Sequence, residues 1–316
     1  MRTIGVDVGG TSVRAGVVDE RGQVLDTARG HTPPDERALE DVICSVVGAL
    51  AARHPVSAVG LAVAGFVASD RRTVLFAPHL PWRDAPVADR IAGRLGIPVV
   101  LEHDANAAAV GEHRHGALRG ARVGLLVALG TGIGGALLLD GTVFRGAHGV
   151  APELGHLRLV PNGRPCGCGK SGCWERYCSG TALAATALDL MATTPADAPL
   201  LSREVSTDPG ALTGRKVAAA AREGDPVAQR AIADLAHWLG EGLALTADVY
   251  DPEVIVIGGG VSDSAELFLD AARDHYARTL TGAGHRPLAR IRPAQLGDDA
   301  GLVGAAALAA ELHVSG

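Results

Sequence analysis

Short apolar runs alternate with longer stretches of helical periodicity along this chain. The runs that predict strands lie in residues 3–28, taken as three strands, and at Val56–Val63, Val99–Glu102, Val123–Leu129, Ala136–Leu139, Val254–Ile257 and near Arg290. Helical stripes lie at about Arg37–Arg53, Pro86–Leu95, Ala105–Glu112, in the region up to Asp248, from about Ala265, and at Gly301–Leu312. Strands that alternate with helices predict the α/β class.

Two of the predicted strands run directly into glycine-rich turns. The first turn is Gly9, Gly10 and Thr11, and the second is Gly130, Thr131 and Gly132. Each is followed by another apolar run, so each predicts a β-hairpin and not the strand–turn–helix of a dinucleotide fingerprint. One such turn alone is equally typical of two core strands. The repetition favours a pair of sites whose backbone N–H groups and threonine hydroxyls hold phosphates.

Asp7 lies inside the first of these strands. Magnesium prefers carboxylate and water oxygens together with substrate phosphates. We therefore expect Asp7 to hold Mg²⁺ near the phosphates, and we expect the duplicated hairpins to close on one nucleotide.

The composition excludes several classes of protein. The chain has 316 residues, is 47% hydrophobic and 20% charged, and carries a formal net charge of −6. The chain has no long basic stretch of the kind that binds nucleic acid. It also has no apolar run that approaches the roughly 20 residues of a membrane span. The first strand begins at Thr3, which leaves no room for a signal peptide, so we expect a soluble cytoplasmic protein.

A carboxylate occupies a strand-to-helix junction in the motif Glu102-His103-Asp104-Ala105-Asn106. Asp104 could simply cap the helix that follows. In a chain with two phosphate turns, a second interpretation is favoured. The hydroxyl that accepts a phosphoryl group needs a positioned base, and an aspartate serves as that base in kinases.

Four residues have the spacing of metal ligands: His156, Cys166, Cys168 and Cys173. Three thiolates and one imidazole form a closed tetrahedral zinc site, which is typical of structural zinc. Free thiols are the alternative. Glu153 and Glu175 flank this cluster, and they are either surface charges or groups held rigidly for the hydroxyls of a sugar.

Together these motifs resemble the ROK (repressor, open reading frame, kinase) family of sugar kinases, and most of all its bacterial zinc-containing glucokinases. The resemblance extends from the Asp7–Thr11 motif to Ile257–Gly260 and covers most of the chain. It implies an actin-like ATPase (ribonuclease H-like) fold with two lobes around a cleft. It also implies ATP as the phosphoryl donor and a homodimer or homotetramer.

The resemblance further implies individual roles. Asp104 would be the catalytic base. The sugar would be held by Gly65, His79, His103, Asp104, Glu153, His156 and Glu175. The nucleotide and its magnesium would be held by Asp7, Gly9, Gly10, Thr11, Gly130, Thr131, Gly132, Gly258, Gly259 and Gly260. His156 would bind zinc with one ring nitrogen and offer the other to the sugar.

Two positions depart from the glucokinase pattern, because His79 and His103 stand where the family usually has asparagine. Both positions would face the C3–C4 side of the sugar. A neutral imidazole offers one donor and one acceptor, whereas asparagine offers two donors and an acceptor. An amine at C3 would suit the imidazole acceptors, which suggests 3-amino-3-deoxyglucose (kanosamine), an antibiotic precursor. Neutral drift in an ordinary glucokinase is the alternative.

We expect an N-terminal lobe at residues 1–116, with the helix at about 300–316 packed back on it, and a larger lobe at 117–299 that carries the zinc loop. A sugar-sensing regulator of the same family is a remote alternative. It would need a helix-turn-helix of about 70 residues before the first phosphate strand.

Overall fold

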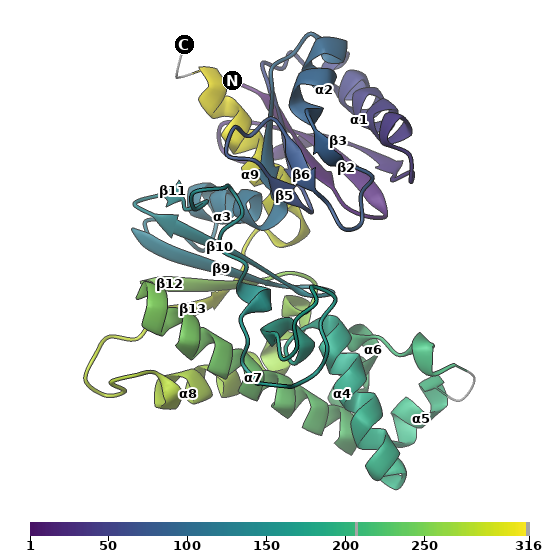
Figure 1. The fold of residues 1–316 in the computed structure, drawn as a ribbon, viewed down its shortest axis with the longest axis vertical. Coiled ribbons are helices and arrows are strands. Elements are labelled where there is room, and N and C mark those ends of the chain that lie inside the picture. Colours follow the sequence, from purple (N-terminus) through teal and green to yellow (C-terminus); the bar gives the residue numbers. More distant parts are fainter. Residues whose placement is uncertain (206–207, 314–316) are drawn as a thin grey trace. The chain divides into compact units, whose positions relative to one another are not determined.

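The computed structural model describes residues 1–205 and 208–313. It divides into two compact units (Figure 1). Unit 1 comprises Met1–Leu126, Ala136–Pro152 and Ala294–Gly316, and unit 2 comprises Val127–Gly135 and Glu153–Pro293. The expected lobe boundary at residues 116 and 117 stays a prediction.

A five-stranded sheet forms the centre of unit 1, in the order β3-β2-β1-β4-β8. Its strands are β1 (Thr3–Val8), β2 (Ser12–Val18), β3 (Val24–His31), β4 (Val59–Val63) and β8 (Val99–His103). The first three pair antiparallel, and β1, β4 and β8 run parallel. Gly22 donates its N–H to the Asp19 carbonyl at 3.0 Å, which closes the turn between β2 and β3. The antiparallel pairing of β1 with β2 across residues 9–11 confirms the first predicted hairpin.

Helices cover this sheet and bury its strands. They are α1 (Glu36–Ala51), α2 (Val87–Leu95), α3 (Asp104–His115) and α9 (Ala300–Ala310). The apolar stripe of α1 packs into the core with the sheet and α2, and Cys44 lies partly buried beside it. Asp35 caps α1, where its carboxylate accepts from the N–H of Ala38 at 2.9 Å. A small sheet, made of β5 (Phe66–Val67), β6 (Val74–Phe76) and β7 (Arg83–Ala85), completes unit 1.

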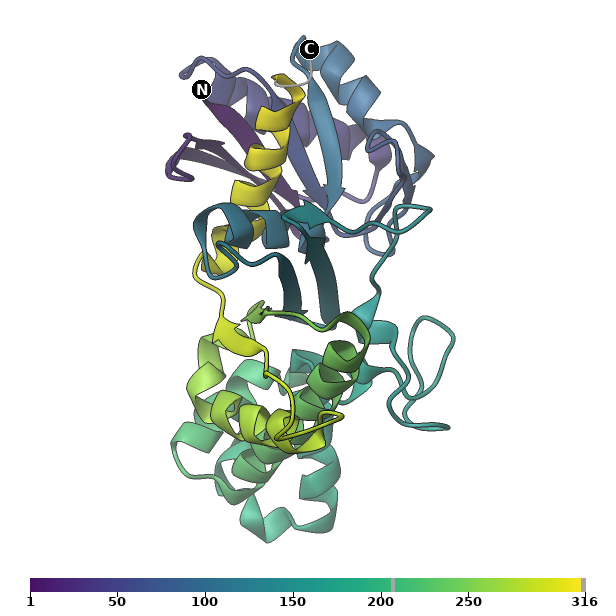
Figure 2. The same cartoon turned by 90° about the vertical axis from the view of Figure 1, so that its left-hand side faces the viewer.

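The C-terminal helix α9 lies directly against the strands that begin the chain (Figure 2). Glycines allow this approach. A methyl group on Gly5 of β1 would lie 1.8 Å from the Leu302 carbonyl oxygen, and one on Gly60 of β4 would lie 1.9 Å from that of Ala305. Thr3 donates its hydroxyl to the Ala306 carbonyl at 2.8 Å. The helix is therefore fixed to β1 and β4 by backbone contact.

Unit 2 is mostly helical. Its helices are α4 (Gly180–Thr193), α5 (Pro199–Val205), α6 (Gly214–Arg222), α7 (Pro226–Tyr250) and α8 (Leu269–Thr279), and its parallel strands are β12 (Val254–Gly258) and β13 (Arg290–Pro293). The boundary between the units passes through both β9 (Val123–Leu129) and β10 (Ile133–Leu139). Strand β10 pairs antiparallel with the short β11 (Thr142–Val143).

The structure corrects several expected boundaries. The strand expected at Val56–Val63 begins at Val59, and the strand after the second glycine turn begins at Ile133 instead of Ala136. The helix expected from Ala265 begins at Leu269, because Ser264 has non-helical backbone angles and the preceding turn is a 3-10 helix. In the helical region before Asp248, α5 forms at Pro199–Val205, and residues 206–207 lie outside the described part. Residues 314–316 of the expected C-terminal helix also lie outside it.

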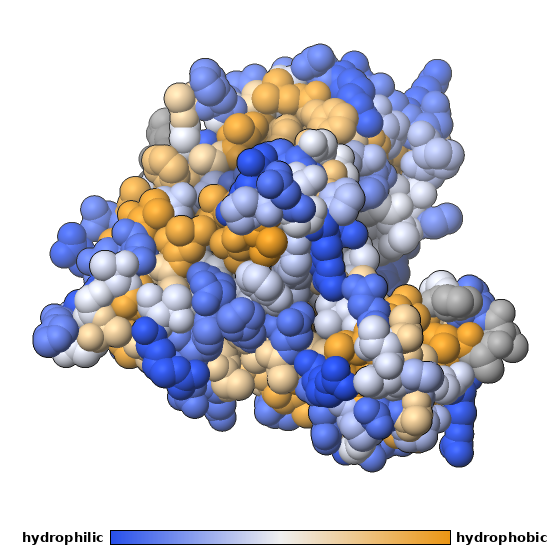
Figure 3. All heavy atoms as spheres, turned by 60° about the horizontal axis from the view of Figure 1, so that its bottom comes forward, coloured by the Kyte–Doolittle hydropathy of each residue, from blue (hydrophilic) through white to orange (hydrophobic). Residues whose placement is uncertain are grey.

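Within the described residues, no helix is both long and apolar enough to cross a membrane. Figure 3 shows one face of the molecule, on which apolar residues form patches among hydrophilic ones. Large exposed apolar side chains include Leu245 and Val249 near the end of α7, which are 39% and 65% exposed.

We predict that Gly60→Ala lowers the free energy of unfolding by about 2 kcal/mol or more, since the added methyl meets the backbone of α9 and overpacking typically costs 1–3 kcal/mol. Gly93→Ala in α2 is the matched control, because its methyl group meets nothing within 4 Å and a helical glycine-to-alanine change is stabilising. Urea denaturation of both variants measures the difference. Equal stability of the two variants would contradict the contact.

Candidate active site

Unit 2 contains a cavity of about 590 Å³, a volume suited to a small ligand. Three glycine-containing turns line it. They contribute Gly130 and Thr131 after β9, Gly180 at the start of α4, and Gly260 after β12. The turns also contact one another: Gly180 donates to the Gly130 carbonyl at 2.8 Å, and Val261 donates to the Leu129 carbonyl at 2.9 Å. The cavity therefore joins two of the turns that the sequence assigns to a nucleotide.

Two helices begin at this cavity. Ser179 caps α4 and accepts from the N–H of Ala182, and Thr213 caps α6 and accepts from the N–H of Lys216. Gly180, Thr181, Gly214 and Arg215 all line the space. The N-terminus of a helix carries a partial positive charge and attracts anions such as phosphate. Our sequence reasoning missed these residues, although a serine or threonine followed by glycine at the start of a helical stripe is a usable signal.

The glycines have more than one role. Gly259 has a φ of +78°. A methyl group on it would lie 2.5 Å from the Leu129 carbonyl oxygen, so it permits the turn to approach β9. Gly258 is buried in β12. Gly9 and Gly130 use their N–H groups to close their own turns, donating to the carbonyls of Ser12 and Gly132. Phosphate contacts through the two glycine turns stay a prediction.

In unit 1, Asp104 is the first residue of α3 and directly follows β8. Its carboxylate accepts from the N–H of Ala105 at 2.7 Å, so it partly satisfies the start of the helix. The other partner is His103, whose Nε2 lies 3.1 Å from the same carboxylate oxygen. The two interpretations of Asp104 are thus compatible, since a carboxylate can cap the helix and still present its second oxygen.

Asp7 lies opposite Arg14 in the β1–β2 pair. Burial, followed by repulsion from the Asp104 carboxylate, raises the pKa of Asp7 to about 6, although Arg14 acts in the opposite direction. Asp298 adds further negative charge. A largely buried carboxylate that is repelled by two more exposed ones is a favourable environment for a hard cation such as Mg²⁺. The residues present therefore fit the expected metal.

A buried carboxylate fixes the turn that carries Asp104. Glu102 is 2% exposed and accepts from Arg145 at 2.5 and 2.9 Å. Arg71 lies 3.5 Å from it, and Asn106 donates to its second oxygen at 3.0 Å. Sequence reasoning missed both arginines, because they lie far from the motif along the chain. A glutamate inside an apolar strand was the one available signal, since such a charge must be paired when buried.

The other residues assigned to the sugar in unit 1 lie on loops. His79 is exposed, and its Cβ would be 3.1 Å from a methyl group on Gly10, so this side chain lies against the first glycine turn, next to Thr11. Gly65 is buried, and a methyl group there would lie 2.7 Å from the Phe76 carbonyl oxygen. The structure therefore brings His79 to Gly10, and it brings His103 and Asp7 to Asp104.

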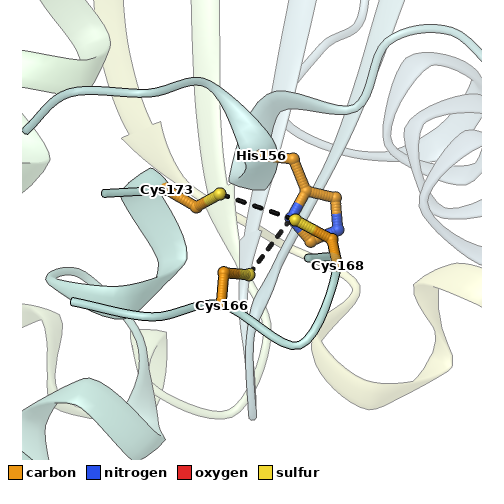
Figure 4. A group of neighbouring side chains, drawn as sticks. All are labelled: His156, Cys166, Cys168 and Cys173. Carbon is orange, nitrogen blue, oxygen red and sulfur yellow. Dashed lines mark hydrogen bonds between the residues drawn. The ribbon is translucent and has the colours of Figure 1, made fainter. Parts of the chain in front are cut away.

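In unit 2 the four expected metal ligands point toward one another (Figure 4). Cys168 Sγ and Cys173 Sγ are 3.7 Å apart, and Cys166 Sγ is 3.7 Å from Nδ1 of His156. Zinc–sulfur bonds of about 2.3 Å at tetrahedral angles require sulfurs about 3.8 Å apart. The residues therefore fit zinc. Burial raises the pKa of the Cys166 thiol to about 12, so a metal ion must displace its proton.

Two glutamates contact this cluster. Glu153 lies 3.9 Å from Nε2 of His156, and Glu175 lies 3.5 Å from Nδ1. Glu175 also accepts from the Cys166 thiol at 3.0 Å, and its carboxylate would be 2.4 Å from a methyl group on Gly132. Unit 2 therefore brings Glu153, His156, Glu175 and the second glycine turn together.

A glycine-lined cavity at two helix N-termini, and a carboxylate at a strand end beside Asp7, are features expected of a nucleotide-dependent phosphotransferase. The model described as "ROK family" matches residues 3–312, so the chain belongs to the ROK family. It is 46% identical over 309 residues to a glucokinase of Streptomyces coelicolor, covering 98% of each chain.

Solved structures agree with this assignment. The crystal structure of a ROK family glucokinase from Streptomyces griseus in complex with glucose and AMPPNP matches with a TM-score of 0.89 and 47% identity, covering 98% of this chain and 100% of that one. A ROK hexokinase from Thermus thermophilus matches with a TM-score of 0.83 and 34% identity over 100% of both chains. These matches confirm the predicted kinase family, the α/β class and the two-lobed actin-like ATPase fold.

We predict that Asp7→Asn stabilises the metal-free protein more at pH 7.5 than at pH 4.5. The folded-state pKa of about 6 exceeds the ordinary value of 3.8, so the unfolded chain loses its proton first as the pH rises. The parent therefore loses stability between about pH 4 and 6, by roughly 2 kcal/mol, and the variant does not.

Urea denaturation in EDTA at both pH values measures this difference. Asp41→Asn on the surface of α1 is the control, and its effect should not depend on pH in this way. A gain for Asp7→Asn that is the same at pH 4.5 and pH 7.5 would contradict the buried, repelled carboxylate.

Proposed function

We propose that this protein is a glucokinase, which transfers the γ-phosphoryl group of ATP to the 6-hydroxyl of glucose. The observation that carries the proposal is the 47% identity, over 98% of the chain, to a glucokinase crystallised with glucose and AMPPNP. The site geometry supports it independently, because the chain combines a phosphate-compatible cavity with a carboxylate positioned as a base.

Asp104 is the proposed catalytic base. Glu102 and its arginines hold the end of β8, and the N–H of Ala105 and the His103 ring hold one carboxylate oxygen. The other carboxylate oxygen of Asp104 then accepts the proton of the C6 hydroxyl of glucose. The hydroxyl oxygen attacks the γ-phosphorus of ATP, and ADP leaves. A base that is held in a fixed position both removes the proton and aligns the attacking hydroxyl with the phosphorus.

Unit 2 supplies the proposed nucleotide site. Thr131 and the starts of α4 and α6 favour phosphate oxygens, and Gly260 leaves room for the adenosine. The turn formed by Gly9, Gly10 and Thr11 in unit 1 is also proposed to contact the phosphates, through its backbone and the Thr11 hydroxyl. Mg²⁺, held at Asp7, would neutralise charge on the phosphates.

Glu153, His156 and Glu175 are the proposed ligands of the C1–C2 side of glucose. Zinc held by the three cysteines and by Nδ1 of His156 would take the place of the Cys166 proton, which Glu175 accepts in this structure. The Glu175 carboxylate and Nε2 of His156 would then be available to the hydroxyls of the sugar. Zinc in this arrangement orients a substrate ligand and takes no part in the chemical step.

The substrate preference proposed here is glucose, with kanosamine as the alternative. The relatives support glucose, since both Streptomyces proteins are glucokinases. The contact of His103 with Asp104 also weakens the argument for an amino sugar, because Nε2 is already directed at the base. His79 remains exposed and could still contact a substituent at C3. A homodimer or homotetramer also remains a prediction.

We predict that Asp104→Asn lowers kcat at least about 100-fold, because general-base catalysis is typically worth 10²–10⁴, while the KM for glucose changes little. Asp140→Asn is the matched control, since Asp140 forms an exposed ion pair with Arg122 and should leave kcat unchanged. A coupled ADP-release assay measures both. Turnover of Asp104→Asn near that of the parent would remove Asp104 as the base.

We also predict that the parent has a higher kcat/KM for glucose than for kanosamine. In the double variant His79→Asn, His103→Asn, the ratio of kcat/KM for glucose to kcat/KM for kanosamine should differ from that of the parent by less than about threefold. If the histidines instead accept from a C3 amine, exchange of one or two hydrogen bonds would shift the ratio toward glucose by about 1–3 kcal/mol. A parent that prefers kanosamine and shows that shift would establish the alternative.

A further inference from the structure

A second group of metal-binding side chains lies in unit 2, apart from the cysteine cluster. It consists of His237 and Glu241 on α7 and His275 on α8, and one ligand atom from each lies within 4.8 Å of the others. His237 and Glu241 are four residues apart and therefore share one face of α7. His275 reaches this face from the neighbouring helix.

The packing of the two helices places His275 there. A methyl group on Gly240 would lie 2.7 Å from the Cβ and the Cδ2 of His275. Any larger residue at 240 would therefore displace the imidazole. The ring of His275 also packs edge-on against that of His237, with 4.5 Å between centroids. The crossing of α7 and α8 thus holds two imidazoles and one carboxylate together.

The cluster could also be a simple link between two helices, because Nε2 of His275 lies 2.7 Å from the Glu241 carboxylate. That contact does not involve His237, which is exposed, packs against the rings of Trp238 and His275, and lies close enough to Asp234 to interact with its charge. Two nitrogens and one oxygen from a helix pair are a typical donor set for Zn²⁺, and bound ligands would be about 3.3 Å apart. Binding therefore requires His275 and Glu241 to separate by about half an ångström, and the His237 nitrogen, which lies within 4.8 Å of both, to move closer to them.

We propose that His237, Glu241 and His275 form a second divalent transition-metal site, which takes Zn²⁺ and links α7 to α8. The hydroxyl of Thr279, 3.2 Å from Nε2 of His275, lies at the edge of the site. Three protein ligands leave a coordination position for water. This site is independent of the proposed glucokinase activity and of the cysteine cluster.

The experiment is equilibrium dialysis of the full chain against Zn²⁺, with the metal per chain measured by atomic spectroscopy. We expect two zinc ions in the parent and one in each of His237→Gln, Glu241→Gln and His275→Gln. His285→Gln, an exposed histidine outside the cluster, should keep two. Cys168→Ser should lose the other ion, which separates failure at one site from failure at the other.

Thermal unfolding distinguishes a metal site from a metal-free helix link. Zinc that binds only the folded state raises Tm with increasing concentration. Without metal, we expect His237→Gln to have the same Tm as the parent. With zinc, we expect the Tm of His237→Gln to rise less than that of the parent, because only the cysteine site can still bind. The missing part of the rise should equal the rise seen in Cys168→Ser, which keeps only the second site. Equal zinc content and equal zinc-dependent rise in the parent and His237→Gln would overturn the proposal.

Discussion

The contact between the α9 backbone and the central sheet of unit 1 is the constraint on which the candidate base and metal site depend. Gly5 and Gly60 leave no side chain between β1 or β4 and the helix. On its other side, α9 meets α3 just as closely, since a methyl group on Gly304 would lie 1.6 Å from the Ala107 carbonyl oxygen. Asp7 is the penultimate residue of β1 and Asp104 begins α3, so α9 touches both elements that carry the acidic groups. Core packing thereby sets the geometry of these carboxylates.

Holding these carboxylates close together is electrostatically unfavourable, and this unfavourable energy is informative about function. Burial and Asp104 both oppose ionisation of Asp7, and Arg14 only partly offsets them. A protein that needed only a stable core would place apolar residues there. Groups whose pKa is displaced by burial and by a specific like charge are concentrated at functional sites. A cation that bridges to phosphates would relieve this repulsion, which makes metal binding and substrate binding mutually favourable.

Much of this arrangement could be predicted from the sequence, because it depends on local patterns. Apolar runs that end in glycine identified both hairpins, and the spacing of His156 and its cysteines identified residues that do converge. Contacts between distant segments could not be predicted. Nothing near Glu102 in the chain indicates Arg145, and nothing in the glycine turns indicates that α4 and α6 begin beside them. The use of the Gly9 and Gly130 N–H groups within their own turns also depends on backbone geometry that residue type alone does not determine.

Helix α7 connects the features of unit 2 that concern metals. Trp174 directly follows Cys173, one of the proposed zinc ligands. A methyl group on Gly242 would lie 2.0 Å from the nearest atom of the Trp174 ring, so the ring packs against the α7 backbone there. The same indole donates to the Trp238 carbonyl at 2.8 Å. Gly240, two residues from Gly242, accommodates His275 instead, and residues two apart on a helix face different directions. One helix therefore supports the cysteine loop on one side and α8 on the other.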